Sequence, residues 1–404
     1  MSRLLLALAV GVVSAFAPVA RRGASATPMN SAAIDIAKGA VSTKLPLSVK
    51  PGVVTGKALM DLLTYAKETG FAIPAVNCVS SCGINACLEA AAKYGGPMIV
   101  QFSRGGGQFM AGKYVSSQKG NADIASIAGC VAGALQVRQL AALYGVPVIL
   151  HTDHCMREWL PWFDGLMEAN EDYFAKNGEP LFSSHMLDLS EDPLEENIET
   201  CVKYLTRMSK VNLLLEMELG ITGGEEDGVD NSNVDSSKLY TQPEEVWAVY
   251  EALSKIEGGM FTVAAAFGNV HGVYSPGNVK LQPQILHNTQ KFISEKLGGP
   301  NKLPVFFVFH GGSGSSTEDI QYALEAGTIK MNIDTDTQWS FWDGIRAYEA
   351  KNRPFLQGQI GNPEGEFKPN KKYYDPRMSL RSAEEATVIR LGKAMEDLKC
   401  INVI

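Results

Sequence analysis

The chain has 404 residues, of which 45% are hydrophobic and 20% are charged, and its formal net charge is −8. This composition is typical of a soluble globular protein with an ample core, and the lack of a basic cluster argues against a nucleic-acid-binding protein. Because an acidic chain does not attract phosphorylated ligands by its overall charge, a phosphate site would need local backbone amides and a few cations.

The first 28 residues have the composition of a targeting sequence. The apolar core at residues 4–13 is too short to span a bilayer, and Val13-Ser14-Ala15 after it is typical of a signal cleavage site. The stretch from Phe16 to Pro28 is basic, rich in Ser and Ala, and free of acids, as transit peptides are. The sequence therefore predicts a signal plus transit presequence over residues 1–28, with a plain secretory signal as the alternative.

The join Ser14-Ala15-Phe16-Ala17-Pro18 resembles the bipartite presequence of algae with complex plastids. This resemblance implies that the mature protein works inside the plastid (chloroplast) and is not held in a membrane. Removing residues 1–28 takes away three arginines and no acids, so the net charge would change from −8 to −11. Residues 29–51 are expected to be a tether before a single domain over residues 52–404.

From Thr55 onward, helical patterns alternate with short apolar runs. The segments Thr55–Thr69, Ile84–Lys93 and Ile124–Tyr144 are expected to be helices. Each apolar run is nearly continuous, as expected for a parallel strand that is buried on both faces. The eight strand candidates are Phe71–Asn77, Pro97–Ser103, Val146–Asp153, Phe182–Leu189, Asn212–Leu219, Phe261–Phe267, Val305–His310 and Ile329–Asp334.

Eight strands that alternate with helices predict an α/β fold, a closed (β/α)8 TIM barrel with a C-terminal helical extension. The alternative is an open, doubly wound sheet. No Gly-x-Gly-x-x-Gly motif follows the first strand candidate, which argues against a dinucleotide-binding sheet of that kind. Because barrels present their active sites at the C-terminal ends of the strands, those ends are where function should be sought.

Residues that can bind a metal or carry a proton gather at these strand ends. Three of them are histidines, His154, His271 and His310. Three histidines with one position left open are a ligand set of catalytic zinc, so we predict that these three bind the metal. The full set is Asn77, Ser103, Asp153, His154, His185, Asp188, Glu216, Glu218, His271, His310, Asn332 and Asp334.

Three later loops have glycine-rich or acidic sequences. The loop Gly220–Asp230 combines glycine hinges with four acids, which makes it a candidate lid carrying a general base. The segments His310–Gly314 and Asn332–Thr337 follow strands seven and eight, where barrels commonly bind phosphate through backbone N–H groups.

The seven cysteines are an odd number in a chain of this size. Cys78, Cys82 and Cys87 lie close together and could form a metal cluster. Their position, where a strand runs into a helix, instead favours buried, reduced thiols, which fits a reducing compartment.

Five blocks of this chain resemble class II fructose-1,6-bisphosphate aldolases of the longer, dimeric subgroup, and the resemblance covers roughly Gly52 to Ile404. It implies a metal-dependent lyase that cleaves fructose 1,6-bisphosphate to dihydroxyacetone phosphate and glyceraldehyde 3-phosphate, and that also runs in reverse. Such a reaction belongs to glycolysis, gluconeogenesis or plastid carbon fixation. The blocks are His151–Cys155, Gly223–Asp230, Phe267–Gly272, Phe309–Ser315 and Met331–Gln338.

By this resemblance, His154, His271 and His310 hold Zn²⁺, while Asp188 and Glu218 serve an alternate or second divalent metal position. A monovalent cation is also implied, and the functional unit is a homodimer.

The same resemblance assigns roles to residues around the metal. Glu226 corresponds to the base, Asp153 to the acid that handles the aldehyde oxygen, and Asn332 to the amide that stabilises the enediolate. Arg377 corresponds to an arginine that reaches across the dimer to the distal phosphate. The residues implied to contact substrate are Asn77 and Ser103 on the glyceraldehyde phosphate side, and Gly272, Gly311, Gly312, Ser313, Asn332, Ile333, Asp334 and Thr335 on the dihydroxyacetone phosphate side.

Two positions depart from the family pattern. Arg104 stands where asparagine is usual, and Ser275 stands where lysine is frequent. Neither is one of the catalytic positions, so these departures bear on local charge and affinity.

Several residues have ordinary alternative interpretations. His151 and His185 are expected to be structural barrel residues, and His287 is expected at the surface. A barrel aldolase can also use a Schiff-base lysine. No strand candidate ends in lysine, however, and Lys330 is expected near the start of strand eight, at the wrong end for catalysis.

Three other functions are alternatives to a fructose-bisphosphate aldolase. The sequence does not separate this interpretation from sedoheptulose- or tagatose-bisphosphate aldolases, which differ in the handedness of one or two hydroxyls of the substrate. A metal-dependent hydrolase would use similar ligands, but the phosphate loops and Arg377 argue against it. A catalytically silent barrel used as a binding protein would be expected to lose part of its site, whereas Asp153, Glu226 and the three histidines are all present.

Overall fold

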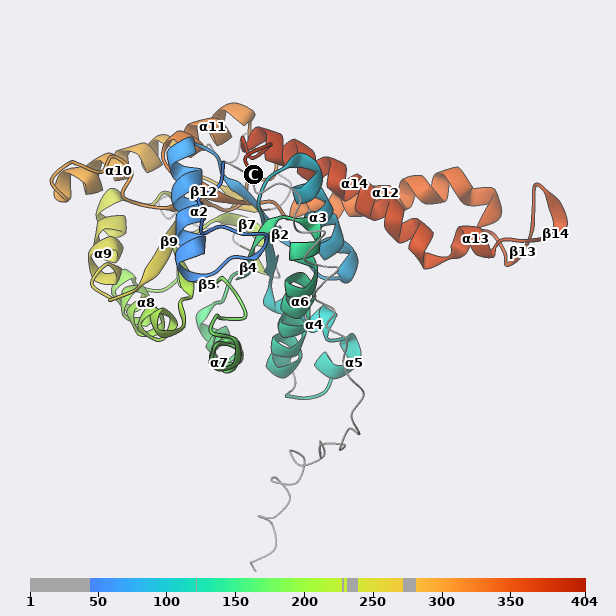
Figure 1. Cartoon of the computed structure of the whole chain (residues 1–404), viewed down its shortest axis with the longest axis horizontal. Coiled ribbons are helices and arrows are strands. Elements are labelled where there is room, and N and C mark those ends of the chain that lie inside the picture. Colours follow the sequence, from blue (N-terminus) through green and yellow to red (C-terminus); the bar gives the residue numbers. More distant parts are fainter. Residues whose placement is uncertain (1–43, 121, 227–228, 231–238, 272–280) are drawn as a thin grey trace, which may run out of the picture.

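The computed structural model describes residues 44–404, apart from 121, 227–228, 231–238 and 272–280, and gives only the backbone of 224–226, 229–230 and 271. Its centre is a parallel barrel that closes where the last strand pairs with the first (Figure 1). In order around the barrel the strands are β2 (Ile73–Asn77), β3 (Met98–Phe102), β4 (Pro147–Thr152), β5 (Ser184–Leu187), β6 (Leu214–Leu219), β9 (Met260–Ala265), β11 (Phe307–Phe309) and β12 (Thr328–Asn332).

Each strand candidate from the sequence contains or overlaps one barrel strand, so the predicted TIM barrel is confirmed and the open sheet is excluded. The strands are short and almost entirely buried, which explains their continuous apolar sequences. Polar residues interrupt them on the interior face. In β6, for example, Glu216 and Glu218 alternate with Leu215, Met217 and Leu219.

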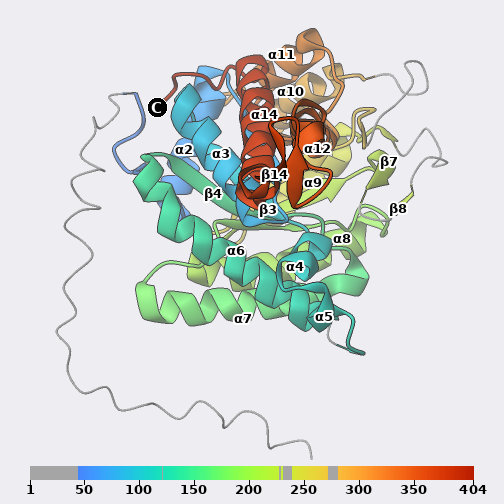
Figure 2. The same cartoon turned by 90° about the vertical axis from the view of Figure 1, so that its right-hand side faces the viewer.

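Helices cover the outside of the barrel (Figure 2). The expected helices are found at α2 (Gly56–Thr69), α3 (Ser81–Tyr94) and α6 (Ala122–Tyr144). By length and composition alone α6 could cross a membrane, but it packs against α4, α7 and β4 as a covering helix does. The other covering helices are α4 (Arg104–Met110), α5 (Lys113–Ser116), α7 (Leu160–Asn177), α8 (Leu194–Met208), α9 (Pro243–Leu253), α10 (Gln284–Lys296) and α11 (Thr317–Glu325), with short 3₁₀ turns at Arg157–Trp159 and Ser209–Val211.

The expected tether is partly packed on the domain. A short strand, β1 (Gly52–Val53), extends the sheet beside the start of β4. Before it, Val49 is only 5% exposed and Ser48 donates a hydrogen bond to Asp61. Part of the segment 44–51 therefore packs on the domain, and the presequence at 1–28 lies outside the described residues.

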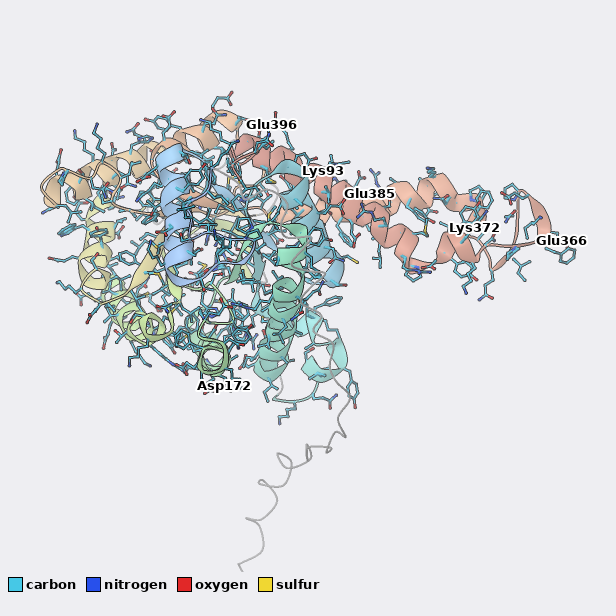
Figure 3. All side chains as sticks on the ribbon, viewed as in Figure 1. Lys93, Asp172, Glu366, Lys372, Glu385 and Glu396 are labelled. Carbon is cyan, nitrogen blue, oxygen red and sulfur yellow. The ribbon has the colours of Figure 1, made fainter. Side chains whose placement is uncertain are left out.

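The C-terminal extension is a long arm that projects from the barrel (Figure 1). Its two main helices, α12 (Thr335–Asn352) and α14 (Pro376–Asp397), lie side by side. They approach so closely that a Cβ on Gly344 would lie 2.5 Å from the Ser382 carbonyl oxygen. Figure 3 labels Glu366 and Lys372 on the outer part of the arm and Glu396 beside the barrel. The outer elements are a 3₁₀ turn (Arg353–Phe355), β13 (Ile360–Asn362), β14 (Gly365–Pro369) and α13 (Lys371–Tyr374).

The glycine-rich acidic segment after β6 is not wholly a loop. It contains β7 (Gly223–Glu226) and β8 (Val229–Asp230), which pair antiparallel, and β7 also pairs in parallel with β10 (Val270–His271). The sequence did not predict these strands, because glycines and adjacent acids are poor strand formers. Their formation places the backbones of Glu226 and His271 in neighbouring strands.

All seven cysteines are free. Cys78 and Cys87 are buried, as expected, whereas Cys82 is only half-buried. Cys78 and Cys87 are neighbours, with their sulfur atoms 3.7 Å apart. Among the described residues, no cysteine belongs to a group of side chains that could hold a metal ion.

Candidate active site

The first strand-end histidine sits in an unusual backbone conformation. His154 follows β4 with φ of 30°, a region that non-glycine residues adopt at an energetic cost and that is enriched at active sites. Its Nδ1 lies 2.9 Å from Asp188 Oδ2, at the end of β5, and 3.6 Å from Glu218 Oε2 in β6. Three neighbouring strands therefore direct one imidazole and two carboxylates to the same place.

The second histidine, His310, completes this cluster from the other side of the barrel mouth. It follows β11, and its ring centroid lies 4.8 Å from that of His154. Its Nδ1 lies 3.4 Å from Glu218 Oε2, while its Nε2 lies 2.9 Å from Glu216 Oε1. Burial lowers the pKa of His310, but the carboxylates of Glu218 and Glu216 outweigh it and raise the pKa to about 9.

These side chains fit a divalent metal. Asp153, His154 and His310 form one group of possible ligand atoms within 4.8 Å of one another, and His154, Asp188 and Glu218 form a second. Glu218 Oε2 is buried, and no donor among the described residues forms a hydrogen bond with it. A buried carboxylate oxygen between two imidazoles is well suited to a cation.

The third histidine is placed by its backbone alone. His271 pairs with Gly224 of β7, and its side chain lies outside what the structure describes. Two residues earlier, the buried Asn269 donates hydrogen bonds to the carbonyl of His310 and to Thr222, each at 3.1 Å. Thr222 in turn donates to Glu218. The segment that leads to His271 is thus tied to the cluster.

A carboxylate surrounded by amides lies beside the candidate metal site. Asp153 is fully buried and accepts hydrogen bonds from Gln101 at 2.8 Å, Asn77 at 3.1 Å and Asn332 at 3.2 Å. Burial raises the pKa of Asp153, but the charges of His154, Lys330 and His310 hold it below its usual value. Three donors around one carboxyl favour the ionised form.

The glycine-rich turn after β11 forms a cradle beside the start of α12. Gly311 has φ of 61°, and a Cβ there would lie 2.4 Å from the Val270 carbonyl oxygen, so only glycine fits. The Gly312 N–H bonds to the Asn332 carbonyl, and the Ser313 hydroxyl is buried without a partner among the described residues. A helix N-terminus with such a turn beside it suits a phosphate group. Ile333, Asp334 and Thr335 lead into this helix, whereas Gly272 lies outside the described residues.

The remaining predicted residues lie around the barrel mouth or away from it. Ser103 caps α4 by accepting a hydrogen bond from the Gly106 N–H. Arg104, beside it, pairs with Asp123 and lies over the Trp159 ring. Arg377 is not brought to the cluster of its own chain. It is 88% exposed at the outer end of α14 and pairs with Asp375.

The sequence analysis placed Lys330 at the wrong end of the barrel for catalysis, and this expectation is wrong. Lys330 is the central residue of β12, two positions before Asn332, and its Nζ donates to both carboxylate oxygens of Glu216 inside the barrel. The strand was expected to start one residue too late, and its inward-facing register was missed.

The other histidines behave as expected. His151 is buried, with Nδ1 2.8 Å from the Ser184 hydroxyl. His185 bonds to Thr152 and Asn170 in the barrel wall, and burial lowers its pKa to about 3. His287 lies on α10, where its Nε2 bonds to a carbonyl.

This arrangement can be set beside known proteins. The family model described as "Fructose-bisphosphate aldolase class-II" matches residues 57–403. The chain belongs to this family. A fructose-bisphosphate aldolase from Campylobacter jejuni is 59% identical over 354 residues, which cover 88% of this chain and 98% of that protein. The class 2 enzyme of Escherichia coli is 56% identical over 356 residues (88% and 98%), and an aldolase of Neurospora crassa is 53% identical over 358 residues (89% and 98%).

The solved structures agree with these sequence comparisons. The crystal structure of the Campylobacter jejuni aldolase has a TM-score of 0.79 at 57% identity and covers 88% of this chain and 98% of its own. The chain is therefore a class II fructose-bisphosphate aldolase, a metal-dependent carbon–carbon lyase built on a TIM barrel that acts on phosphorylated sugars.

Proposed function

We propose that this aldolase uses zinc held by His154, His271 and His310, and that each active site is completed by Arg377 of the partner subunit in a homodimer. The observation that carries the metal assignment is that Asp153, His154 and His310 bring ligand atoms within 4.8 Å of one another at the barrel mouth, and that His154 does the same with Asp188 and Glu218. Two imidazoles in one site favour zinc over magnesium, which prefers oxygen ligands. Asp188 and Glu218 would serve an alternate or second metal position.

Zinc would supply a Lewis acid for the ketone oxygen of dihydroxyacetone phosphate, which makes the adjacent C–H acidic. Glu226 would remove and return that proton, since its strand pairs with the one carrying His271. The Asn332 amide would donate a hydrogen bond where negative charge develops. In cleavage, the ionised Asp153 would accept the proton of the hydroxyl that becomes the aldehyde, and in condensation it would return this proton.

Each of the two phosphates of fructose 1,6-bisphosphate needs its own binding site. The cradle of Gly272, Gly311, Gly312 and Ser313, with the start of α12, would bind the phosphate of dihydroxyacetone phosphate through backbone N–H groups. Asn77 and Ser103 would face the glyceraldehyde phosphate half. A bound monovalent cation would add positive charge to a protein whose overall charge is negative.

The dimer is proposed from the arm. Arg377 lies on a part of the arm that projects from its own barrel (Figure 1). The arm also exposes large apolar side chains, which are costly in a monomer and suit a subunit interface. They include Trp339, Trp342, Ile360, Phe367, Tyr374 and Met378.

Arg377→Ala is expected to lower kcat/KM for fructose 1,6-bisphosphate by roughly 10–100-fold, because a charge-assisted contact to phosphate is worth about 1.5–3 kcal/mol. Proton exchange of dihydroxyacetone phosphate should change far less, because that substrate lacks the distal phosphate. Lys372→Ala, which removes another exposed cation from the arm, is the matched control.

Subunit exchange then tests the sharing of sites. Mixing Arg377→Ala with an inactive Glu226→Gln variant should recover activity, because one site of each heterodimer would combine both intact residues. Steady-state assays before and after mixing measure this recovery. If exchanged heterodimers gain no activity, Arg377 acts within its own subunit.

We also propose that the mature enzyme works in the plastid of a complex-plastid alga, with residues 1–28 as the presequence and 52–404 as the catalytic domain. A fluorescent fusion of residues 1–30 is expected to enter the plastid, and Phe16→Ala should hold it at an earlier membrane. Microscopy in such an alga measures this. Cytosolic fluorescence from the unmutated fusion would defeat the assignment, and secretion would favour a plain signal peptide.

A further inference from the structure

A buried ion pair crosses the barrel interior directly beneath the candidate metal site. Lys330 Nζ donates to Glu216 Oε1 at 2.7 Å and to Oε2 at 2.8 Å. The two side chains are 4% and 2% exposed, and their strands, β12 and β6, are separated in the barrel by β9 and β11. Such a pair is weak evidence for stability, because the cost of removing both charges from water offsets much of their attraction. Stability alone therefore does not account for this pair.

Glu216 connects this pair to His310. The oxygen that accepts from Lys330, Oε1, also lies 2.9 Å from His310 Nε2. The other ring nitrogen, Nδ1, faces Glu218 and the His154 ring. Once a metal displaces the proton from Nδ1, a carboxylate against Nε2 would keep the remaining proton on Nε2 and leave Nδ1 to bind the metal.

Lys330 holds the Glu216 carboxylate in the position where it contacts His310. Without the ammonium group, the Glu216 carboxylate would lose both hydrogen bonds that hold it in place. It could also turn toward His151, whose Nε2 lies 3.7 Å from Glu216 Oε2. Either change would weaken the hold on His310 without touching substrate or metal directly.

We propose that Lys330 is a positioning residue for the metal centre, which acts through Glu216 to keep His310 in the orientation and tautomer that binds metal. This inference rests on the proposed role of His310 as a zinc ligand. Its two carboxylate contacts give the Lys330 amino group a structural partner, in contrast to the free amine that a Schiff-base mechanism would require.

Zinc affinity is the first measurement, made on the purified metal-free enzyme by competition with a chromophoric chelator. Lys330→Met keeps the length of the side chain but removes its charge, and it should weaken zinc binding roughly 10–100-fold, as expected for a residue that supports a ligand. Lys330→Arg keeps the charge and should recover part of the affinity. Lys67→Met is the matched control, because Lys67 is a partly buried lysine that donates to the Leu303 carbonyl away from the cluster.

A double-mutant cycle separates this role from a general effect on folding. If Lys330 acts through Glu216, Lys330→Met should change zinc affinity little in a Glu216→Gln background. Histidine ¹⁵N NMR of the zinc-loaded enzyme should show His310 protonated at Nε2, and Lys330→Met should lose this tautomer. Should Lys330→Met fail to fold, Lys330→Gln, which retains a donor toward Glu216, takes its place in the same cycle.

Unchanged zinc affinity and an unchanged His310 tautomer in folded Lys330→Met enzyme would overturn the proposal. So would fully additive effects in the cycle, which would mean that Lys330 and Glu216 act independently. Failure of the underlying ligand assignment is distinguishable, because His310→Ala would then leave zinc affinity intact.

Discussion

Replacing Glu226 by glutamine is expected to slow the exchange of the dihydroxyacetone phosphate C–H proton with solvent by roughly 10²–10⁴-fold. Glutamine preserves size but cannot accept the proton, and β7 pairs with the strand that carries His271. Isotope exchange into dihydroxyacetone phosphate alone measures this step without carbon–carbon cleavage. Glu225→Gln, which changes the adjacent acid on the same strand, is the matched control and should retain exchange.

Asp153→Asn should give the opposite pattern. Asp153 is held among three amide donors, so asparagine would lose the ionised carboxylate that cleavage requires. Cleavage of fructose 1,6-bisphosphate should fall more than proton exchange does. Equal loss of both activities in the Glu226 and Asp153 variants would contradict the division of proton transfer between these residues.

The barrel could be predicted because its strands are buried on both faces and leave continuous apolar runs. The β7–β8 pair could not, since its sequence of glycines and acids resembles a solvated loop. The arm was predicted only as a helical extension. Its two helices meet closely at Gly344, and no local pattern relates these two segments of the sequence.

The strand-end chemistry could be predicted for a physical reason: parallel strands bring their C-terminal ends together, so polar residues there become neighbours. The buried polar residues beneath the candidate metal site were not predicted. Lys330 and Glu216 are 114 residues apart, and their pairing depends on the register of two strands across the barrel. Gln101 gave a signal, as a polar residue within the apolar run of β3, but its partner Asp153 is evident only in three dimensions.

Removing the metal is expected to abolish cleavage of fructose 1,6-bisphosphate. Without the cation that His154, His271 and His310 would hold, nothing would polarise the ketone. Zinc or cobalt added back to the chelated enzyme should restore activity, whereas magnesium should not, since imidazole ligands favour the former. A coupled assay with and without chelator measures each step.

Borohydride reduction in the presence of dihydroxyacetone phosphate, followed by intact-mass measurement, distinguishes metal-dependent from imine chemistry most directly. Reduction traps an imine as a permanent adduct on lysine, and Lys330, the lysine found inside the barrel, would be the site to inspect. We expect an unchanged protein mass and full activity after borohydride, with activity lost only after chelation. A reduced substrate adduct, in an enzyme that remains active in chelator, would contradict the account.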